Sequence, residues 1–250
     1  LMRYRHGNSV CISSQVGCRM GCRFCASTLS GLVRNLMPSE MLEQVYQIQK
    51  ITGERVSNIV VMGMGEPFDN YDNLVTFLRM VSDGNGLNIS GRNVTVSTCG
   101  ITPRIRQFAE EGFTANLALS LHAPKDADRE GLMPVARMYP LAQVMEALDD
   151  YYKITKRRLT FEYSLIAGVN DSAGQAGELA RLVKGKNCLV NLIPVNEVRE
   201  RDFKRSDPRN IQNFKNILEK NGINVTIRRE MGSDINAACG QLRKSYMDGR

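Results

Sequence analysis

The sequence predicts an α/β fold in which helices cover a parallel sheet that forms a partial or complete barrel. Short runs rich in Val, Ile and Leu alternate with longer amphipathic stretches, and this alternation is typical of βαβ units. Strands are expected in residues 57–64, 93–99, 115–121, 158–166 and 188–195. Helices are expected in residues 39–52, 73–82, 101–112, 141–155 and 173–185. Five or six such units would make most or all of a barrel.

The first element is an extended segment, NSVCISS, at residues 8–14. Pro38 and Ser39 come directly before an apolar periodic stretch, and this order marks the start of the first helix. Gly112 and Gly185 fit the ends of two later helices. In sheets of this kind, function gathers at the carboxyl ends of the strands. We therefore expect the functional residues in the loops that follow strands.

The composition excludes several classes of protein. Hydrophobic residues make up 42% and charged residues 24% of the chain, which is ordinary for a globular protein. No apolar run approaches the ~18 residues of a membrane span, and the first residues lack the apolar core of a signal peptide. We expect one domain over residues 1–250, in the cytoplasm and without a membrane partner. The net charge of +7 favours an anionic partner such as nucleic acid, or reflects only a solvated basic surface.

Four of the seven cysteines lie within residues 11–25, CISSQVGCRMGCRFC. An odd number of cysteines with a tight cluster favours a metal or redox site in a reducing compartment. Cys18, Cys22 and Cys25 have the spacing C-x3-C-x2-C, and Cys11 stands apart. Three thiolates could hold a 4Fe-4S cluster with one iron left open, whereas Cys11 would be needed to complete a four-cysteine zinc site. The spacing favours the cluster and leaves zinc as the alternative.

A C-x3-C-x2-C motif in the first loop after a strand, with the aromatic Phe24 before the last cysteine, resembles the radical S-adenosylmethionine (SAM) superfamily. That resemblance implies a partial (β/α)6 TIM-like barrel with outer helices. It implies a 4Fe-4S cluster held by the three cysteines, whose open iron binds SAM. An electron from the reduced cluster would then cleave SAM to a 5′-deoxyadenosyl radical.

Further motifs narrow the resemblance: CISSQVGC, MGMGEP, VTVSTCG, ALSLHAP, GVNDS, NLIPVN and INAACGQL occur in this order. Together they resemble RlmN-type adenine-C2 RNA methyltransferases over about residues 9–246. The resemblance implies a set of SAM-binding residues at strand ends: Gly65, Glu66, Ser97, Ser120, Leu121, His122 and Asn196. Taken alone, His122 is also compatible with a general base or a structural hydrogen-bonder. Cfr-type enzymes, which methylate adenine C8, share most of the pattern and remain an alternative. A non-catalytic, zinc-stabilised RNA-binding module is a second alternative.

Adenine C2 is an electron-poor carbon that cannot attack the methyl group of SAM, whereas a thiolate can. The resemblance makes Cys239, in NAACGQL, the residue that first takes the methyl group. Its thiomethylene radical would then add to C2 and join enzyme and RNA covalently. Cys11 would release the product by attacking the sulfur of Cys239 and forming a disulfide. Cys99 and Cys188 have no matching role, and we expect both in the core.

The resemblance also implies partners: large-subunit ribosomal RNA, tRNA and a reduced flavodoxin- or ferredoxin-type electron donor, with the enzyme as a monomer. Basic segments at residues 156–158, 199–209 and 228–229 are candidate phosphate contacts or simply solvated faces. Family members usually carry a helical accessory domain before the barrel, and we expect residues 1–250 not to include it. They also place a proton-accepting glutamate upstream of the position of Cys11. The first acidic residue here is Glu40, so we expect that acceptor outside the chain.

Overall fold

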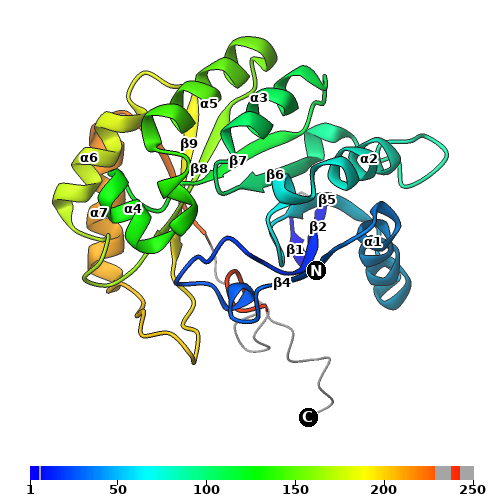
Figure 1. The fold of residues 1–250 in the computed structure, drawn as a ribbon, viewed down its shortest axis with the longest axis horizontal. Helices are drawn as coiled ribbons and strands as arrows, with labels where there is room; N and C mark the ends of the chain where they lie inside the picture. Colours follow the sequence, from blue (N-terminus) through cyan, green and yellow to red (C-terminus); the bar gives the residue numbers. More distant parts are fainter. Residues whose placement is uncertain (6, 229–237, 243–250) are drawn as a thin grey trace.

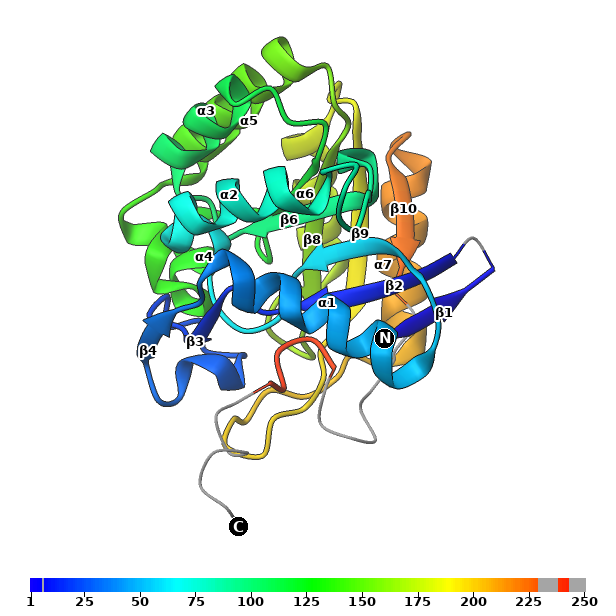
Figure 2. The same ribbon diagram turned by 90° about the vertical axis from the view of Figure 1, so that its right-hand side faces the viewer.

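A computed structural model describes residues 1–5, 7–228 and 238–242 of the chain. One curved sheet of eight strands has the order β1-β2-β5-β6-β7-β8-β9-β10. Seven strands run parallel: β2 (Gly7–Ile12), β5 (Val56–Val61), β6 (Val94–Thr98), β7 (Asn116–Ser120), β8 (Leu159–Leu165), β9 (Cys188–Pro194) and β10 (Asn224–Ile227). β1 (Met2–Tyr4) pairs antiparallel with β2 at one edge. Because β1 and β10 are the two edges and do not pair, the described sheet is an open half-barrel, as Figures 1 and 2 show.

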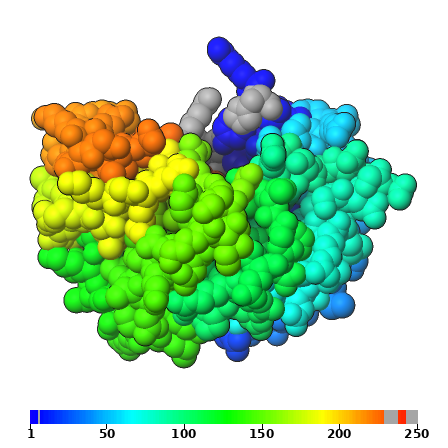
Figure 3. Space-filling model, turned by 90° about the horizontal axis from the view of Figure 1, so that it is seen from above, coloured from blue at the N-terminus to red at the C-terminus, as the bar shows by residue number. Residues whose placement is uncertain are grey.

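Helices follow the parallel strands and cover the outside of the sheet (Figure 1). They are α1 (Pro38–Thr52), α2 (Tyr71–Val81), α3 (Thr102–Glu110), α4 (Asp126–Leu132), α5 (Leu141–Thr155), α6 (Ala173–Val183) and α7 (Pro208–Lys220). Successive units follow one another around the molecule in chain order, which Figure 3 shows as a progression of colour from blue to orange. The predicted partial barrel of βα units is therefore confirmed.

The core lies between the sheet and these helices. Its strand residues, such as Val10, Ile59, Val96 and Leu117, are fully buried. The helices contribute the apolar stripe that their sequence periodicity predicts, and Phe77 of α2 is equally buried. All five predicted strands and all five predicted helices are present within a few residues of the expected bounds. No described helix combines the length and the apolar character needed to cross a membrane.

The sequence reading missed some short elements and the last βα unit. β1 and β10 are edge strands with partly exposed residues, so they lack the continuous apolar run of a buried strand. α7 begins within the basic segment 199–209, so the sequence around its start resembles a charged loop more than an apolar helix. A separate hairpin of β3 (Gln15–Gly17) and β4 (Leu32–Asn35) was also missed. This hairpin matters for function because the loop between its strands carries Cys18, Cys22 and Cys25.

Candidate active site

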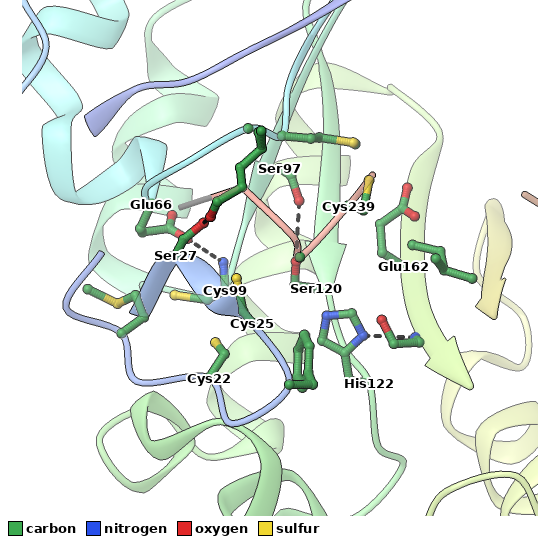
Figure 4. Close-up of a pocket in the computed structure, with 18 of the residues that line it drawn as sticks. Cys22, Cys25, Ser27, Glu66, Ser97, Cys99, Ser120, His122, Glu162 and Cys239 are labelled. Atoms are coloured by element: carbon green, nitrogen blue, oxygen red, sulfur yellow. Dashed lines mark hydrogen bonds between the residues drawn. The ribbon is translucent and has the colours of Figure 1, made fainter. Parts of the chain in front are cut away.

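A chamber lies at the carboxyl ends of the parallel strands, where the sequence predicted the functional residues. It is lined by predicted residues from the cysteine loop, the strand ends and the C-terminal segment: Cys22, Cys25, Gly65, Glu66, Ser97, Ser120, His122, Asn196 and Cys239. Figure 4 shows most of these side chains around one space. Three other predicted residues, Cys11, Cys18 and Leu121, are not among those that line it. Residues that are far apart in the sequence are thus brought together as expected.

The cysteine loop is closed at its base by backbone contacts. The N–H of Cys18 donates to the carbonyl oxygen of Gly31 at 3.0 Å. Gly17 has φ of +79°, and a Cβ there would lie 1.9 Å from that same oxygen. Only glycine fits both the left-handed backbone and the close approach. The glycine of QVGC therefore sets the geometry of the loop that follows it.

Within the loop, hydrogen bonds hold the cysteine backbone in a compact turn. The N–H of Cys25 donates to the carbonyl of Cys22 at 3.2 Å. The hydroxyl of Thr28 donates to the carbonyls of Cys22 and Cys25 at 3.1 and 2.9 Å. Cys22 and Cys25 face the chamber, while Cys18 is buried beside them. The arrangement presents thiols from one loop to one side of the chamber.

Burial raises the pKa of Cys18 to about 12, and it also raises the pKa of Cys22. These thiols therefore need a metal cation before they can bind as thiolates. No three His, Cys, Asp or Glu side chains in the described part of the chain are grouped for a single metal ion. A cubane cluster takes each cysteine on a different iron, so its ligand sulfurs stand farther apart than those around one ion. Three thiols on one loop are a donor set that fits a 4Fe-4S cluster with one open iron.

Glu66 is buried at the turn that follows β5. One of its carboxylate oxygens accepts from the N–H of Cys99 at 2.8 Å, and the other accepts from the N–H of Phe68 at 3.1 Å. Burial raises the pKa of this carboxyl, although both hydrogen bonds favour its charged form. Gly65 has φ of +102°, and a Cβ there would lie 2.5 Å from the Cβ of Gln15. The MGMGEP turn is thereby fixed against the hairpin strand β3.

The ends of β6 and β7 bring two predicted SAM-binding serines together. The hydroxyl oxygens of Ser97 and Ser120 lie 3.3 Å apart (Figure 4). Leu121 is fully buried, and its backbone N–H donates to the carbonyl of Glu162 at 3.0 Å. Its side chain therefore belongs to the core, and any contact of Leu121 with a ligand would have to use its backbone.

His122 serves as a hydrogen-bond acceptor in this structure. Its Nδ1 accepts from the backbone N–H of Ser164 at 2.9 Å, which places the proton of the neutral ring on Nε2. Burial, together with the charge of Arg129, lowers its pKa to about 3. Its backbone is left-handed, with φ of +57°. A ring held neutral in this way is a structural and binding group, and this geometry argues against a general base.

The lowered pKa of His122 predicts a loss of stability in acid. The unfolded chain takes up a proton below about pH 6.5, whereas the folded chain does so only near pH 3. Stability contributed by the neutral ring is therefore complete above pH 6.5 and falls by up to about 1.4 kcal/mol per pH unit below it. His122→Asn keeps an acceptor and tolerates the left-handed backbone. Denaturant unfolding from pH 7 to 4 should show a shallower decline in this variant, and equal slopes would contradict the assignment.

The C-terminal segment at residues 238–242 lies against the cysteine loop, as Figures 1 and 2 both show. The N–H of Ala26 donates to the carbonyl of Gly240 at 2.7 Å, and the hydroxyl of Ser27 donates to the carbonyl of Leu242 at 2.7 Å. The side chain of Asn196 donates to the carbonyl of Cys239 at 3.0 Å. These contacts place Cys239 beside the loop that carries the C-x3-C-x2-C motif.

Cys11 lies on β2, away from the three loop cysteines, and its electrostatic neighbour is Cys239. Burial raises the pKa of Cys11 to about 11, and a negative charge on Cys239 raises it further while Arg228 opposes the shift. Burial also raises the pKa of Cys239, against the same Arg228. The fourth cysteine is thus placed with the C-terminal thiol and one cation. This position does not suit a four-cysteine metal site.

The sequence reading missed three charged residues of the chamber region. Arg129 is fully buried and donates to the carbonyls of Cys99 and Leu121 at 2.6 and 3.1 Å, which ties the ends of β6 and β7 together. Glu162 and Arg228 line the chamber itself. A glutamate inside the apolar strand run RLTFEYSLI was the available signal for Glu162, because an unpaired charge is costly in a buried strand.

The basic segments lie in different places. Residues 156–158 precede β8 and so lie at the end of the sheet opposite the chamber. Arg228 lines the chamber and is not an outer phosphate contact, and Arg229 is outside the described residues. Residues 199–209 follow β9 on the chamber side, where Arg201 donates to the hydroxyl of Thr28 at 3.2 Å. Of the three segments, this one is best placed to meet a large substrate.

Comparisons with known proteins agree with this fold and site. A sequence profile described as the radical SAM superfamily matches residues 12–180. A crystal structure of a radical SAM methyltransferase from Sphaerobacter thermophilus superposes with a TM-score of 0.94 at 46% identity, over 97% of this chain and 72% of that one. SuiB of Streptococcus suis shares the fold alone, with a TM-score of 0.66 at 14% identity over 92% of this chain and 51% of that one. The chain is therefore a radical SAM enzyme, and that superfamily uses a 4Fe-4S cluster and SAM.

Two relatives show which family of radical SAM enzymes this chain belongs to. A protein of Lachnoclostridium phytofermentans, named "Probable dual-specificity RNA methyltransferase RlmN", is 72% identical over 99% of this chain and 70% of its own length. A protein of the same name from Lachnospira eligens is 62% identical over 99% of this chain and 71% of its own length. The chain belongs to the RlmN family of radical SAM RNA methyltransferases. It spans about 70% of the length of these relatives, and the zinc-stabilised RNA-binding alternative was wrong.

Proposed function

We propose that this chain methylates C2 of adenine in large-subunit (23S) ribosomal RNA and in tRNA, through a methylated Cys239. The name shared by its relatives, "Probable dual-specificity RNA methyltransferase RlmN", supports RNA as the substrate and two kinds of target. The observation that carries the proposal is the position of Cys239, which lies in the same chamber as Cys22 and Cys25 and has Cys11 as its electrostatic neighbour. The residue that carries the methyl group must reach both the SAM site and the thiol that later breaks its bond to the RNA.

Cys18, Cys22 and Cys25 would hold the cluster, which supplies the electron for cleavage of SAM. Glu66, Ser97, Ser120 and Asn196 line the rest of the chamber and would orient SAM there. Cys239 would take the methyl group as a thiolate, and that methyl group would lose one hydrogen atom to the 5′-deoxyadenosyl radical as its carbon bonds to adenine C2. Attack of Cys11 on the sulfur of Cys239 would then release the product and leave a disulfide. The target base would leave its stack to enter the chamber, with residues 199–209 as the proposed phosphate contact beside the opening.

Mass spectrometry of the peptide that contains Cys239 tests the carrier step. Protein produced with iron supplied should carry one added methyl group on Cys239. Cys239→Ala should keep its iron, its labile sulfide and its brown colour, because Cys239 is not a cluster ligand, yet it should not methylate RNA. A bare Cys239 thiol in protein that holds a cluster and SAM would refute the carrier role.

The position of the new methyl group separates this function from the Cfr-type alternative. Digestion of the product RNA to nucleosides should give 2-methyladenosine, and 8-methyladenosine would establish the C8 reaction instead. We also propose a single catalytic domain over residues 1–250, a monomeric enzyme in the reducing cytoplasm and a flavodoxin- or ferredoxin-type electron donor. An upstream glutamate remains our proposal for the acceptor of the adenine C2 proton.

A further inference from the structure

A second cavity inside the half-barrel shares a wall with the chamber. Its lining comes from the strands of the sheet and includes Ser9, Thr95, Asn116, Asn191 and Thr226. Three residues line both cavities: Met62, Glu162 and Arg228. A guanidinium nitrogen of Arg228 lies 3.8 Å from the sulfur of Met62. These three side chains therefore separate the chamber from the interior of the barrel.

Glu162 is connected to the outer surface through the second cavity. Its side chain is buried, and one carboxylate oxygen accepts from the amide nitrogen of Asn191 at 2.9 Å. The amide oxygen of Asn191 accepts from the hydroxyl of Thr226 at 2.9 Å, and Thr226 is exposed. An amide does not relay protons, so a proton on Glu162 would exchange with solvent directly in the second cavity, which Glu162 lines.

Glu162 is also the available base on the chamber side. Among described residues, only Glu66 and Glu162 bring a carboxylate to the chamber lining. Both oxygens of Glu66 already accept backbone N–H groups. Figure 4 shows Glu162 beside Cys239 on the side of the chamber away from Glu66. The thiol of Cys239 thus faces one carboxylate that is free to take a proton.

The charges around this pair favour such an exchange. Burial raises the pKa of the Glu162 carboxyl, although Arg228 and Asn191 both favour its charged form. Burial raises the pKa of Cys239 as well, and Arg228 lowers it. Negative charges on Glu162 and Cys25 also raise the pKa of Cys239, so Glu162 and Cys239 are favoured to hold one proton between them. Arg228 in turn is held charged by Cys239, Glu162, Cys11 and Tyr4. The other titratable groups that line the second cavity are Tyr4 of β1 and Arg158.

We propose that Glu162 accepts the thiol proton of Cys239 and that Arg228 stabilises the resulting thiolate. This inference rests on the proposed role of Cys239 as methyl carrier. The S–H bond breaks and the proton goes to the Glu162 carboxylate. The sulfur of Cys239 then bonds to the methyl carbon of SAM, whose bond to the sulfonium breaks to leave S-adenosylhomocysteine. The proton leaves Glu162 to solvent in the second cavity, so charge and atoms balance.

Thiolate formation can be measured without SAM, by alkylation of Cys239 with iodoacetamide in protein that is purified without its cluster, and so with an unmethylated Cys239, and is then given the cluster anaerobically. The alkylated fraction of the Cys239 peptide is read by mass spectrometry across a pH series. In the wild type, the alkylation rate should rise with pH and then level off above the pKa of the Glu162 carboxyl. Above that pH, Glu162 and Cys239 share one proton, so the thiolate fraction of Cys239 stays constant. In Glu162→Gln, the thiol can lose its proton only to water, so the rate should keep rising about tenfold per pH unit.

The matched control is Glu146→Gln on α5, whose side chain is 68% exposed and which forms a surface ion pair with Arg106. It should reproduce the wild-type profile. Parallel profiles for wild type and Glu162→Gln would overturn the inference, while methylation of Cys239 in the wild type would still support the carrier role. A wild type that never carries a methyl group on Cys239 would refute the proposed function itself.

A second variant keeps the test decisive if Glu162→Gln does not fold or does not hold its cluster. Asn191→Ala removes the hydrogen bond that favours the charged carboxylate. The alkylation profile of Asn191→Ala should level off at a higher pH than that of the wild type, because the pKa of Glu162 rises. An unchanged profile in Asn191→Ala would count against Glu162 as the acceptor.

Discussion

Replacing Cys11 with alanine should trap the enzyme on its RNA. When the methyl carbon on Cys239 has bonded to adenine C2, protein and RNA are one covalent molecule. Release requires a thiolate to attack the sulfur of Cys239, which breaks the sulfur–carbon bond and leaves the electron pair on the carbon that becomes the methyl group. A negative charge on Cys239 raises the pKa of Cys11 in this structure, so the two thiols interact. Without it, each enzyme molecule should react about once and stop.

A denaturing gel with labelled RNA measures this directly. Cys11→Ala should give a slow band that contains both protein and RNA, at close to one RNA per active enzyme, and multiple-turnover methylation should fall to background. Cys188 provides the matched control, because it is a buried cysteine at the start of β9 and has no proposed role in the reaction. Cys188→Ala should release its product normally. Multiple turnovers by Cys11→Ala would show that another group resolves the adduct.

The pKa of Cys11 adds a pH dependence to the same experiment. At about 11, it leaves only a small thiolate fraction near pH 7, and Arg228 is the charge that opposes the rise. The release step should therefore speed up as pH rises toward 11, since the thiolate is the attacking form. Formation of the adduct does not use Cys11 and should not share this dependence.

Periodicity and motif spacing predicted the half-barrel and most of the chamber because both follow local rules. The buried strands carry continuous apolar runs, and strands that run parallel bring the ends that carry Glu66, Ser97, Ser120 and Asn196 to one edge. Contacts between residues that are distant in the sequence were harder to predict. Nothing in the segment NAACGQL indicates that its backbone packs against Ala26 and Ser27, and the family resemblance alone supplied the role of Cys239.

Charged residues inside the fold were the main group that sequence reasoning missed. The basic neighbour of Arg228 suggests a surface cation, yet Arg228 follows β10 at the carboxyl end of the sheet, where its charge interacts with Cys11 and Cys239. Arg129 lies in the short helix α4, between motifs, and its role appears only when the carbonyls it binds are seen at the ends of β6 and β7. The role of such residues depends on contacts in the folded chain, which a sequence pattern does not show.

Asn170 in the GVNDS motif should be among the residues most important for stability. It is fully buried. Its amide nitrogen donates to the carbonyls of His122 and Ser164 at 2.7 and 2.6 Å, and its amide oxygen accepts from the N–H of Ile166 at 2.7 Å. One side chain thus joins the end of β7 to the end of β8, next to two residues that line the chamber.

Asn170→Ala would leave one buried N–H without its acceptor and two carbonyls without this donor. At about 1–3 kcal/mol for each group left unsatisfied, the unfolding free energy should fall by roughly 3 kcal/mol or more. For a chain of this size the melting temperature should drop by about 6 °C or more. Asn213→Ala, at an exposed position on α7, should leave it unchanged. Asn170→Ala should also reduce the affinity for SAM, because Asn170 positions His122 and Ser164. An unchanged melting temperature and an unchanged SAM affinity would show that other contacts hold the two strand ends.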